Sequence, residues 1–212
     1  CFLVPSFFFF LFYSLSCAVD GTPNKTNLGA NSILGASLAL AKAGASVRGV
    51  PLYKHFADLA GNPNPNTLPT PCFNVINGGE HAGNKLAFQE FFIIPTGAQT
   101  FKEAMVIGCE VFHNLKAIIK KKHGGDATLI GDEGGFAPPV SVDTSMELLM
   151  EAVDRAGYSD KVTVGLDVAA SEFLVQGENA YDLDFKTKGP EKDLKAILTG
   201  DEMVEHYKKM IR

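Results

Sequence analysis

A stretch rich in proline and asparagine, NPNPNTLPTP from Asn62 to Pro71, places the strongest constraint on how this chain can fold. Proline lacks a backbone N–H and fixes φ, so such a stretch can sustain neither a helix nor a central strand. The residues before it are alanine-rich with leucines at helical spacing, whereas those after it include short apolar runs bounded by Gly, Asn and Pro. We therefore expect two structural parts, residues 20–68 and 69–212, that meet near Pro69.

Hydrophobic spacing predicts the elements of each part. Before the boundary we expect a helix from Lys25 to Ala43, with Gly44 as its stop signal, and a shorter one from Pro51 to Gly61. After the boundary, β-favouring runs give way to amphipathic patterns. The expected order is strand 72–76, strand 88–94, helix 101–123, helix 145–156, strand 161–167 and helix 201–212, the last capped by Thr199 or Asp201. This alternation predicts an α/β fold with a mainly parallel sheet or barrel, whose functional groups gather at the C-terminal strand ends.

The first nineteen residues, CFLVPSFFFFLFYSLSCAV, carry no charge and are crowded with Phe. A signal peptide would need a basic start, which is missing, and a transmembrane helix would need about 20 predominantly apolar residues without Pro5 inside. The residue types are also those that pyrimidine-rich codons encode, which is typical of a translated intron end. We expect the transcript to splice out most of residues 1–19; a signal or anchor and a genuine buried arm are the alternatives.

Composition excludes several function classes. With 46% hydrophobic and 20% charged residues the chain is an ordinary globular one, and its net charge of -5 gives no electrostatic footprint for nucleic acid. The cluster Lys120 to Lys122 is explained by a helix C-terminus, where cations are favourable. The four cysteines form no CxxC pair, so neither a disulfide framework nor a zinc site is indicated and a reducing cytosol is expected.

Two acidic positions follow predicted elements. In GDEGGFAPP, residues 131–139, adjacent acids stand among glycines that allow close approach to a ligand, although Asp132 capping a turn and Glu133 lying in solvent would explain the same pattern. Asp167 ends an apolar strand and precedes small residues, as a carboxylate ligand of Mg²⁺ would, with a helix cap or loop turn as the alternative.

Two further positions precede the long helix. Glu90 lies within a buried strand, so it must point outward or be paired, because an isolated buried charge is too costly. His81, in NGGEHAGN, lies on a glycine-flanked loop, where a lone histidine is more often a surface residue than a catalytic one.

Six segments in this order resemble the enolase family closely: DGTPNK, LGANSILGASLALAKA, PLYKHFADLAGN, FNVINGGEHAGNKLAFQEF, IGDEGGFAP and GLDVAASEF. The resemblance runs from about Asp20 to Arg212. It implies the end of an enolase-like N-terminal α+β domain over residues 20–68. The first half of an enolase-type (β/α)8 TIM-like barrel, in the order β-β-α-α-β-α, would follow over residues 69–212.

The resemblance also implies a Mg²⁺-dependent lyase that interconverts 2-phosphoglycerate and phosphoenolpyruvate. Matched residue by residue, Glu133 corresponds to the proton donor, Glu90 to its neighbouring carboxylate, His81 to the mobile-loop histidine that closes over the substrate, and Asp167 to the first of three Mg²⁺ carboxylate ligands. Removing a proton beside a carboxylate creates a dianion, which metal ions stabilise, as is known for enolase-superfamily sites, and hydroxide leaves poorly unless an acid protonates it. The implied partners are this small substrate and, in the full-length protein, a second copy of the chain, in the cytoplasm; neither nucleic acid nor, unless residues 1–19 are real, a membrane is expected.

The sequence departs from the family pattern in what it contains. The family's lysine base, its other two Mg²⁺ carboxylates and its phosphate-binding residues would follow Arg212, and the serine loop that ligates a second metal would precede Asp20, so we expect this chain alone to be inactive. Glu80 stands where a small residue is usual before the loop histidine, and Pro139 where Asn is usual. The rivals to a truncated enzyme are a non-catalytic product of an enolase-like gene and a membrane-anchored or secreted form.

Overall fold

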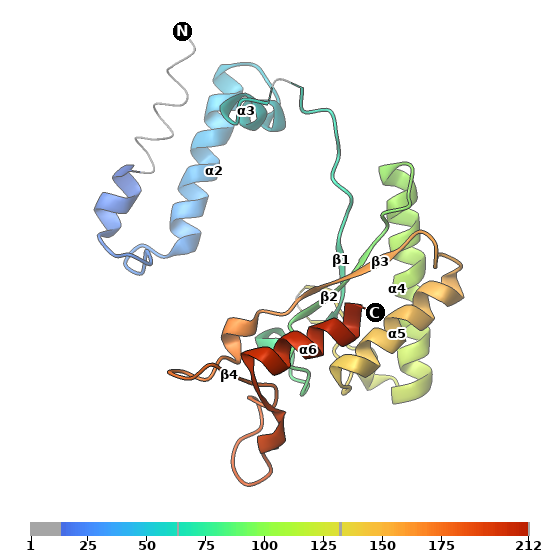
Figure 1. Cartoon of the computed structure of the whole chain (residues 1–212). Helices are drawn as coiled ribbons and strands as arrows, with labels where there is room; N and C mark the ends of the chain where they lie inside the picture. Colours follow the sequence, from blue (N-terminus) through green and yellow to red (C-terminus); the bar gives the residue numbers. More distant parts are fainter. Residues whose placement is uncertain (1–13, 63, 132, 212) are drawn as a thin grey trace. The chain divides into compact units, whose positions relative to one another are not determined.

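The computed structural model describes residues 14–62, 64–131 and 133–211, and the chain divides between Thr67 and Leu68 into two compact units (Figure 1). Most of the apolar run, and Asp132, lie outside the described residues, so the expectations about them stay predictions. Residues 14–20 are helical. Each unit is described below by itself.

The first unit is built on two helices, α2 (Ala30–Val47) and α3 (Leu52–Leu59). Helix α2 begins later than Lys25 because the Asp20 carboxylate accepts the backbone N–H groups of Thr22 at 3.0 Å and Leu28 at 2.8 Å, which holds the preceding residues in turns. The prediction that Gly44 ends this helix is wrong. Gly44 lies inside α2 because a Cβ there would stand 2.8 Å from Nε2 of the buried His55 on α3, so the glycine serves helix packing instead.

The second unit contains a three-stranded sheet in the order β1 (Phe73–Asn77), β2 (Glu90–Ile94) and β3 (Thr163–Asp167). Both pairings are antiparallel, so the expectation of a mainly parallel sheet is wrong for these strands. The connection explains the difference. One crossover helix would make β3 parallel to β2, whereas here two successive helices return the chain to the end at which β2 finished.

Those two helices, α4 (Phe101–His123) and α5 (Val142–Ala156), pack against each other and the sheet. Helix α4 has the predicted bounds, with the Thr100 side chain accepting the N–H of Glu103. Helix α5 begins three residues before the predicted Ser145, because the Ser141 hydroxyl caps it by accepting the N–H of Thr144 at 3.2 Å. The largest fully buried side chains of this unit include Phe88, Phe91, Phe136, Ile107, Leu115 and Leu148.

A small hairpin follows the sheet and was not predicted. It joins β4 (Ala180–Asp182) to β5 (Ile197–Thr199) and leads into α6 (Gly200–Ile211), whose first turn is capped by Thr199 as expected. Four short 3-10 helices complete the described elements: η1 (Gly79–His81), η2 (Asp126–Thr128), η3 (Ala170–Glu172) and η4 (Leu194–Ala196). Apart from this hairpin, the predicted β-β-α-α-β-α order is present.

Among the described residues, each helix taken singly is too short or too polar to cross a membrane. Helices α2 and α3, which meet at a 100° bend, reach the length and hydropathy of a span only when they are taken together.

Candidate functional site

Three of the four predicted site residues meet at one end of the sheet. His81 lies in η1 after β1, Glu90 begins β2, and Glu133 lies in the loop between η2 and α5. The His81 Nδ1 atom stands 3.1 Å from Glu133 Oε1 and 3.8 Å from Glu90 Oε1. Segments separated by about fifty residues in the chain thus bring two carboxyls and an imidazole into one cluster.

Two asparagines of β1 donate hydrogen bonds to Glu133, and neither of them was predicted from the sequence as a site residue. Asn74 Nδ2 and Asn77 Nδ2 donate to the same oxygen, Glu133 Oε2, at 3.0 Å and 3.2 Å. Asn77 is buried, with 1% of its surface exposed. The two amides inside the otherwise apolar run FNVIN could have indicated this role, because a buried amide must find hydrogen-bond partners.

The loop that carries Glu133 approaches β1 so closely that it requires a glycine. A Cβ on Gly135 would overlap Asn77 Oδ1, and it would also lie 3.3 Å from the carbonyl carbon of Val75. The neighbouring Phe136 N–H donates to Val75 O at 2.9 Å, and Phe136 O accepts the N–H of Asn77 at 2.8 Å. These bonds fix the backbone beside Glu133 to the strand that bears its two asparagine donors.

Asp167, the fourth predicted residue, is placed by the register of the sheet. It ends β3 directly opposite Glu90 on β2. Its side chain accepts the N–H of Ala169 at 3.1 Å, and the residue is exposed to solvent. Asp167 therefore contributes negative charge to the edge of the cluster without joining the group of side chains that touch one another.

The pKa values of the two glutamates are shifted in opposite directions. Burial, together with the hydrogen bond and charge of Glu133 and the charge of Asp167, raises the pKa of Glu90 to about 7. The hydrogen bond from Glu90, assisted by His81 and Asn77, lowers the pKa of Glu133. These opposite shifts mean that the pair binds a proton more readily on Glu90 than on Glu133.

The comparison with protein families agrees with this arrangement. Residues 65–212 match the enolase C-terminal TIM barrel domain, and residues 13–56 match the enolase N-terminal domain. The chain belongs to the enolase family. Its α/β fold class is thereby confirmed, and the family is one of enolase-superfamily lyases with small-molecule substrates.

Enolases are generally Mg²⁺-dependent, and the cluster has donors that can hold a metal ion. Ligand atoms of His81, Glu90 and Glu133 all lie within 4.8 Å of one another. Asp167, the predicted Mg²⁺ ligand, lies beside this trio without being part of it. A hard cation such as Mg²⁺ prefers carboxylate oxygens to imidazole nitrogen, so the donor chemistry favours Asp167 over His81 as its ligand.

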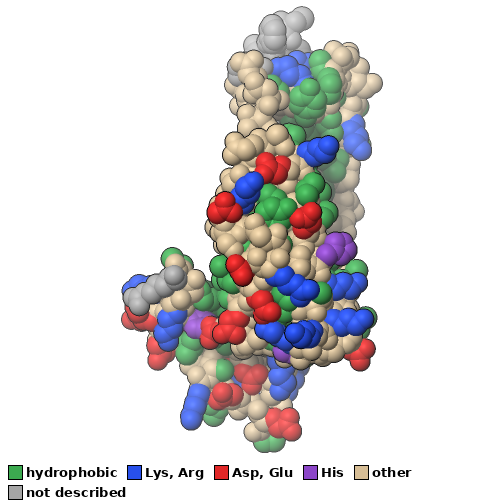
Figure 2. Space-filling view, turned by 90° about the vertical axis from the view of Figure 1, so that its right-hand side faces the viewer, with side chains coloured by type: hydrophobic (Ala, Val, Ile, Leu, Met, Phe, Trp, Pro, Cys, Tyr) green, Lys and Arg blue, Asp and Glu red, His purple; other side chains and the backbone are tan. Residues whose placement is uncertain are grey.

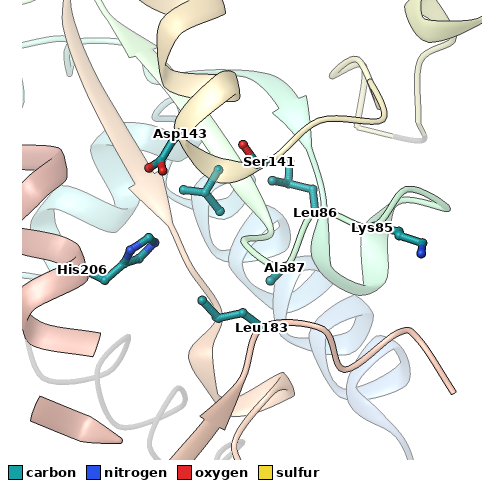
Figure 3. A pocket seen from close by; sticks show the side chains of 8 residues that line it. Lys85, Leu86, Ala87, Ser141, Asp143, Leu183 and His206 are labelled. Atoms are coloured by element: carbon teal, nitrogen blue, oxygen red, sulfur yellow. The ribbon is translucent and has the colours of Figure 1, made fainter. Parts of the chain in front are cut away.

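A separate cavity of about 230 Å³ lies beside the far end of the His81 loop (Figure 3). It is lined by Lys85, Leu86, Ala87, Ser141, Val142, Asp143, Leu183 and His206. The lining contains none of the four predicted site residues, and half of its eight residues are aliphatic. The cavity is therefore distinct from the carboxyl cluster.

The raised pKa of Glu90 predicts how the free energy of unfolding depends on pH. An acid whose pKa is higher in the folded state stabilises that state below its ordinary pKa of 4.5 and loses this contribution as the pH rises toward about 7. Glu90→Gln should remove this loss. The free energy of unfolding of the wild type, minus that of Glu90→Gln, should fall across this window by at most about 1.4 kcal/mol per pH unit.

Urea unfolding of both chains at several pH values between 4.5 and 7.5, with EDTA present, measures this difference. The lowered pKa of Glu133 acts at more acid pH, below its ordinary value, so the two glutamates are separable. A difference that stays flat from pH 4.5 to 7 would show that Glu90 is not the group that holds the proton.

Proposed function

We propose that the protein carrying this chain is the Mg²⁺-dependent hydro-lyase that interconverts 2-phosphoglycerate and phosphoenolpyruvate in glycolysis, in the cytoplasm. The observation that carries the proposal is the pair Glu90 and Glu133, whose Oε1 atoms lie 3.8 Å and 3.1 Å from His81 Nδ1 in a chain of the enolase family. Loss of hydroxide from a carbon needs an acid that keeps a proton near neutral pH, and this pair supplies one.

Each residue has a distinct part in the proposed reaction. Glu133 gives a proton to the departing hydroxide, which leaves as water, and Glu90 holds that proton until it is needed. Asn74 and Asn77 keep Glu133 in place by donating to its Oε2 atom. His81 is exposed, so it can contact a substrate that enters from solvent.

Asp167 is the proposed Mg²⁺ ligand. Glu90 and Glu133 lie beside a single imidazole and Asp167 lies beside Glu90, and this excess of acidic groups fits a bound divalent cation. When bound, Mg²⁺ would neutralise the negative charge that develops on the substrate carboxylate. Asp167 Oδ1 already accepts the N–H of Ala169, which fixes the direction of its carboxylate.

The charge distribution supports a small-molecule partner. The face in Figure 2 carries acidic side chains beside a group of basic ones, and acidic residues outnumber basic ones in the chain, 24 to 19. We propose that the full-length protein acts as a homodimer and binds neither nucleic acid nor, unless residues 1–19 are real, a membrane.

We predict that the 212-residue chain expressed alone does not dehydrate 2-phosphoglycerate measurably. Among residues 14–62, 64–131 and 133–211, the ion-pair partner of Glu90 and of Glu133 is His81, and no lysine amine stands within ion-pair distance of either to remove the substrate proton. An acid without its base cannot assemble the charge field that the transition state needs. The measurement is phosphoenolpyruvate absorbance at saturating Mg²⁺.

Two controls make this result informative. A full-length protein containing the same segment should be active in the same assay, whereas a non-catalytic member of the family would stay silent at full length as well. Phosphoenolpyruvate formed by the 212-residue chain itself would contradict the inactivity prediction.

A further inference from the structure

The loop that carries His81, here called the histidine loop (Gly79–Leu86), has little regular structure of its own. Beyond the single turn of η1, its residues form bends, and His81, Gly83 and Lys85 are exposed. One backbone bond, from Gly79 N–H to Leu86 O at 2.9 Å, ties its two ends, and His81 N–H donates to Gly78 O at 3.1 Å. These bonds reach the base of the loop but not residues 82–85, so the part that follows His81 needs other contacts to hold it.

A lysine from a remote segment supplies the missing anchor. Lys186 lies between β4 and β5, and its Nζ atom donates to Ala82 O at 3.0 Å and to Asn84 O at 2.8 Å. These two carbonyls belong to the residues on either side of Gly83, in the segment that directly follows His81. We propose that Lys186 is a positioning residue that clamps the histidine loop, so that His81 is held beside Glu133.

The surroundings of Lys186 favour this contact over a chance one. The side chain is half-buried, and its ammonium lies 5.8 Å from the centre of the Phe185 ring. Burial lowers the pKa of Lys186, while the nearby carboxylates of Glu80 and Glu172 raise it. A cation that has given up part of its water must gain hydrogen bonds in return, and the two loop carbonyls provide them.

The opposite side of the loop is anchored separately. Asn84 Nδ2 donates to Asn77 O and to Pro138 O, both at 3.0 Å, which ties the loop to β1 and to the segment that follows Glu133. Glu172 Oε2 accepts the N–H of Glu80 at 3.2 Å. Lys186 thus completes a set of contacts that surrounds His81 from both sides, and it also offsets the charge of Glu80, which departs from the family pattern.

This inference rests on the proposed function only for the meaning of His81, and its test does not use enzyme activity. In the 212-residue chain, Lys186→Met removes the cation at nearly constant length. Limited trypsin digestion followed by mass spectrometry measures cleavage after the exposed Lys85, within the loop. We expect cleavage there to be about tenfold faster, equivalent to about 1.4 kcal/mol, because two charge-assisted hydrogen bonds are lost.

A second readout reports on His81 itself. In Glu133→Ala the imidazole loses its carboxylate partner, and the NMR signal of the His81 ring in that chain is the reference for a displaced contact. The signal in Lys186→Met should move toward that reference. Lys186→Arg keeps a cation with several donors, so it should bring both the cleavage rate and the His81 signal back toward the wild-type values.

Two controls separate positioning from general stability. Lys188→Met removes an exposed lysine two residues further along the same segment and should change neither readout. Cleavage after Lys116, in the middle of α4, reports unfolding of the whole unit. The proposal is overturned if Lys186→Met leaves Lys85 cleavage and the His81 signal unchanged, if it accelerates cleavage at Lys85 and Lys116 equally, or if Lys186→Arg behaves like Lys186→Met.

Discussion

Glu133→Gln in the full-length protein is expected to lower turnover by about 10² to 10⁴-fold while changing Mg²⁺ affinity little. Glutamine is nearly isosteric, and its side-chain oxygen can still accept the N–H groups that Asn74 and Asn77 now donate to Glu133 Oε2. The position of the side chain is therefore preserved. What is lost is a carboxyl group that can pass a proton to the departing hydroxide.

The matched variant is Asp167→Asn, which should fail in a different way. Asp167 lies opposite Glu90 at the end of β3, where its charge raises the pKa of Glu90 and where we propose that it binds Mg²⁺. Asparagine keeps the size of the side chain but removes a charged oxygen ligand, so Mg²⁺ affinity should fall together with the rate. Titration of activity and of binding with Mg²⁺ distinguishes the two variants.

Proton exchange at the substrate carbon provides the sharper comparison. Exchange requires the base and the metal but not the loss of hydroxide, so it should survive Glu133→Gln better than overall turnover does. It should be lost in Asp167→Asn. If Glu133→Gln abolished exchange and turnover equally while Mg²⁺ still bound, Glu133 would not be a dedicated acid for the leaving group.

The helical spacing of α4 and the cap of α6 were readable from the sequence because they depend on neighbouring residues, whereas the Ser141 cap of α5 was not predicted. Helix α4 follows its apolar positions, and Thr199 caps α6 through contacts within one turn. The antiparallel direction of β3 was missed although the two helices between it and β2 were predicted, because the rule for strands joined by a single crossover helix was applied. The role of Gly44 as a helix stop was predicted wrongly because its role depends on contact with His55, which lies on another helix.

The site was predictable by residue type but not by arrangement. Family resemblance pointed to His81, Glu90, Glu133 and Asp167, and the structure brings the first three together. Neither the asparagine donors of β1 nor Lys186 could be found in this way. Both act across distances of more than fifty residues in the chain, and only the folded backbone sets them beside their partners.

Gly78→Ala should destabilise the chain strongly, by about 3 kcal/mol, because it adds a methyl group where the backbone leaves no room. Gly78 has a negative φ of -139°, so a left-handed backbone is not what requires the glycine. A Cβ there would lie 2.8 Å from Leu86 O and closer still to Phe88 O. The N–H of Gly78 donates to Gln89 O at 2.8 Å, so relieving the overlap would break the bond that joins the base of the histidine loop to the start of β2.

Gly83→Ala is the control, since it adds the same methyl group to the same loop at a position with nothing within 4 Å. Its effect on the free energy of unfolding should stay within about 0.5 kcal/mol, the usual range for surface substitutions. Urea unfolding of the three chains measures both changes, and the His81 NMR signal shows whether the loop has moved. Because the two substitutions are chemically identical, a difference between them isolates the contact with the backbone of residues 86–88. Equal stabilities would mean that residues 86–88 can shift to admit a side chain. The close approach of Gly78 to these residues, at the base of the histidine loop, would then not be what holds His81 near Glu133.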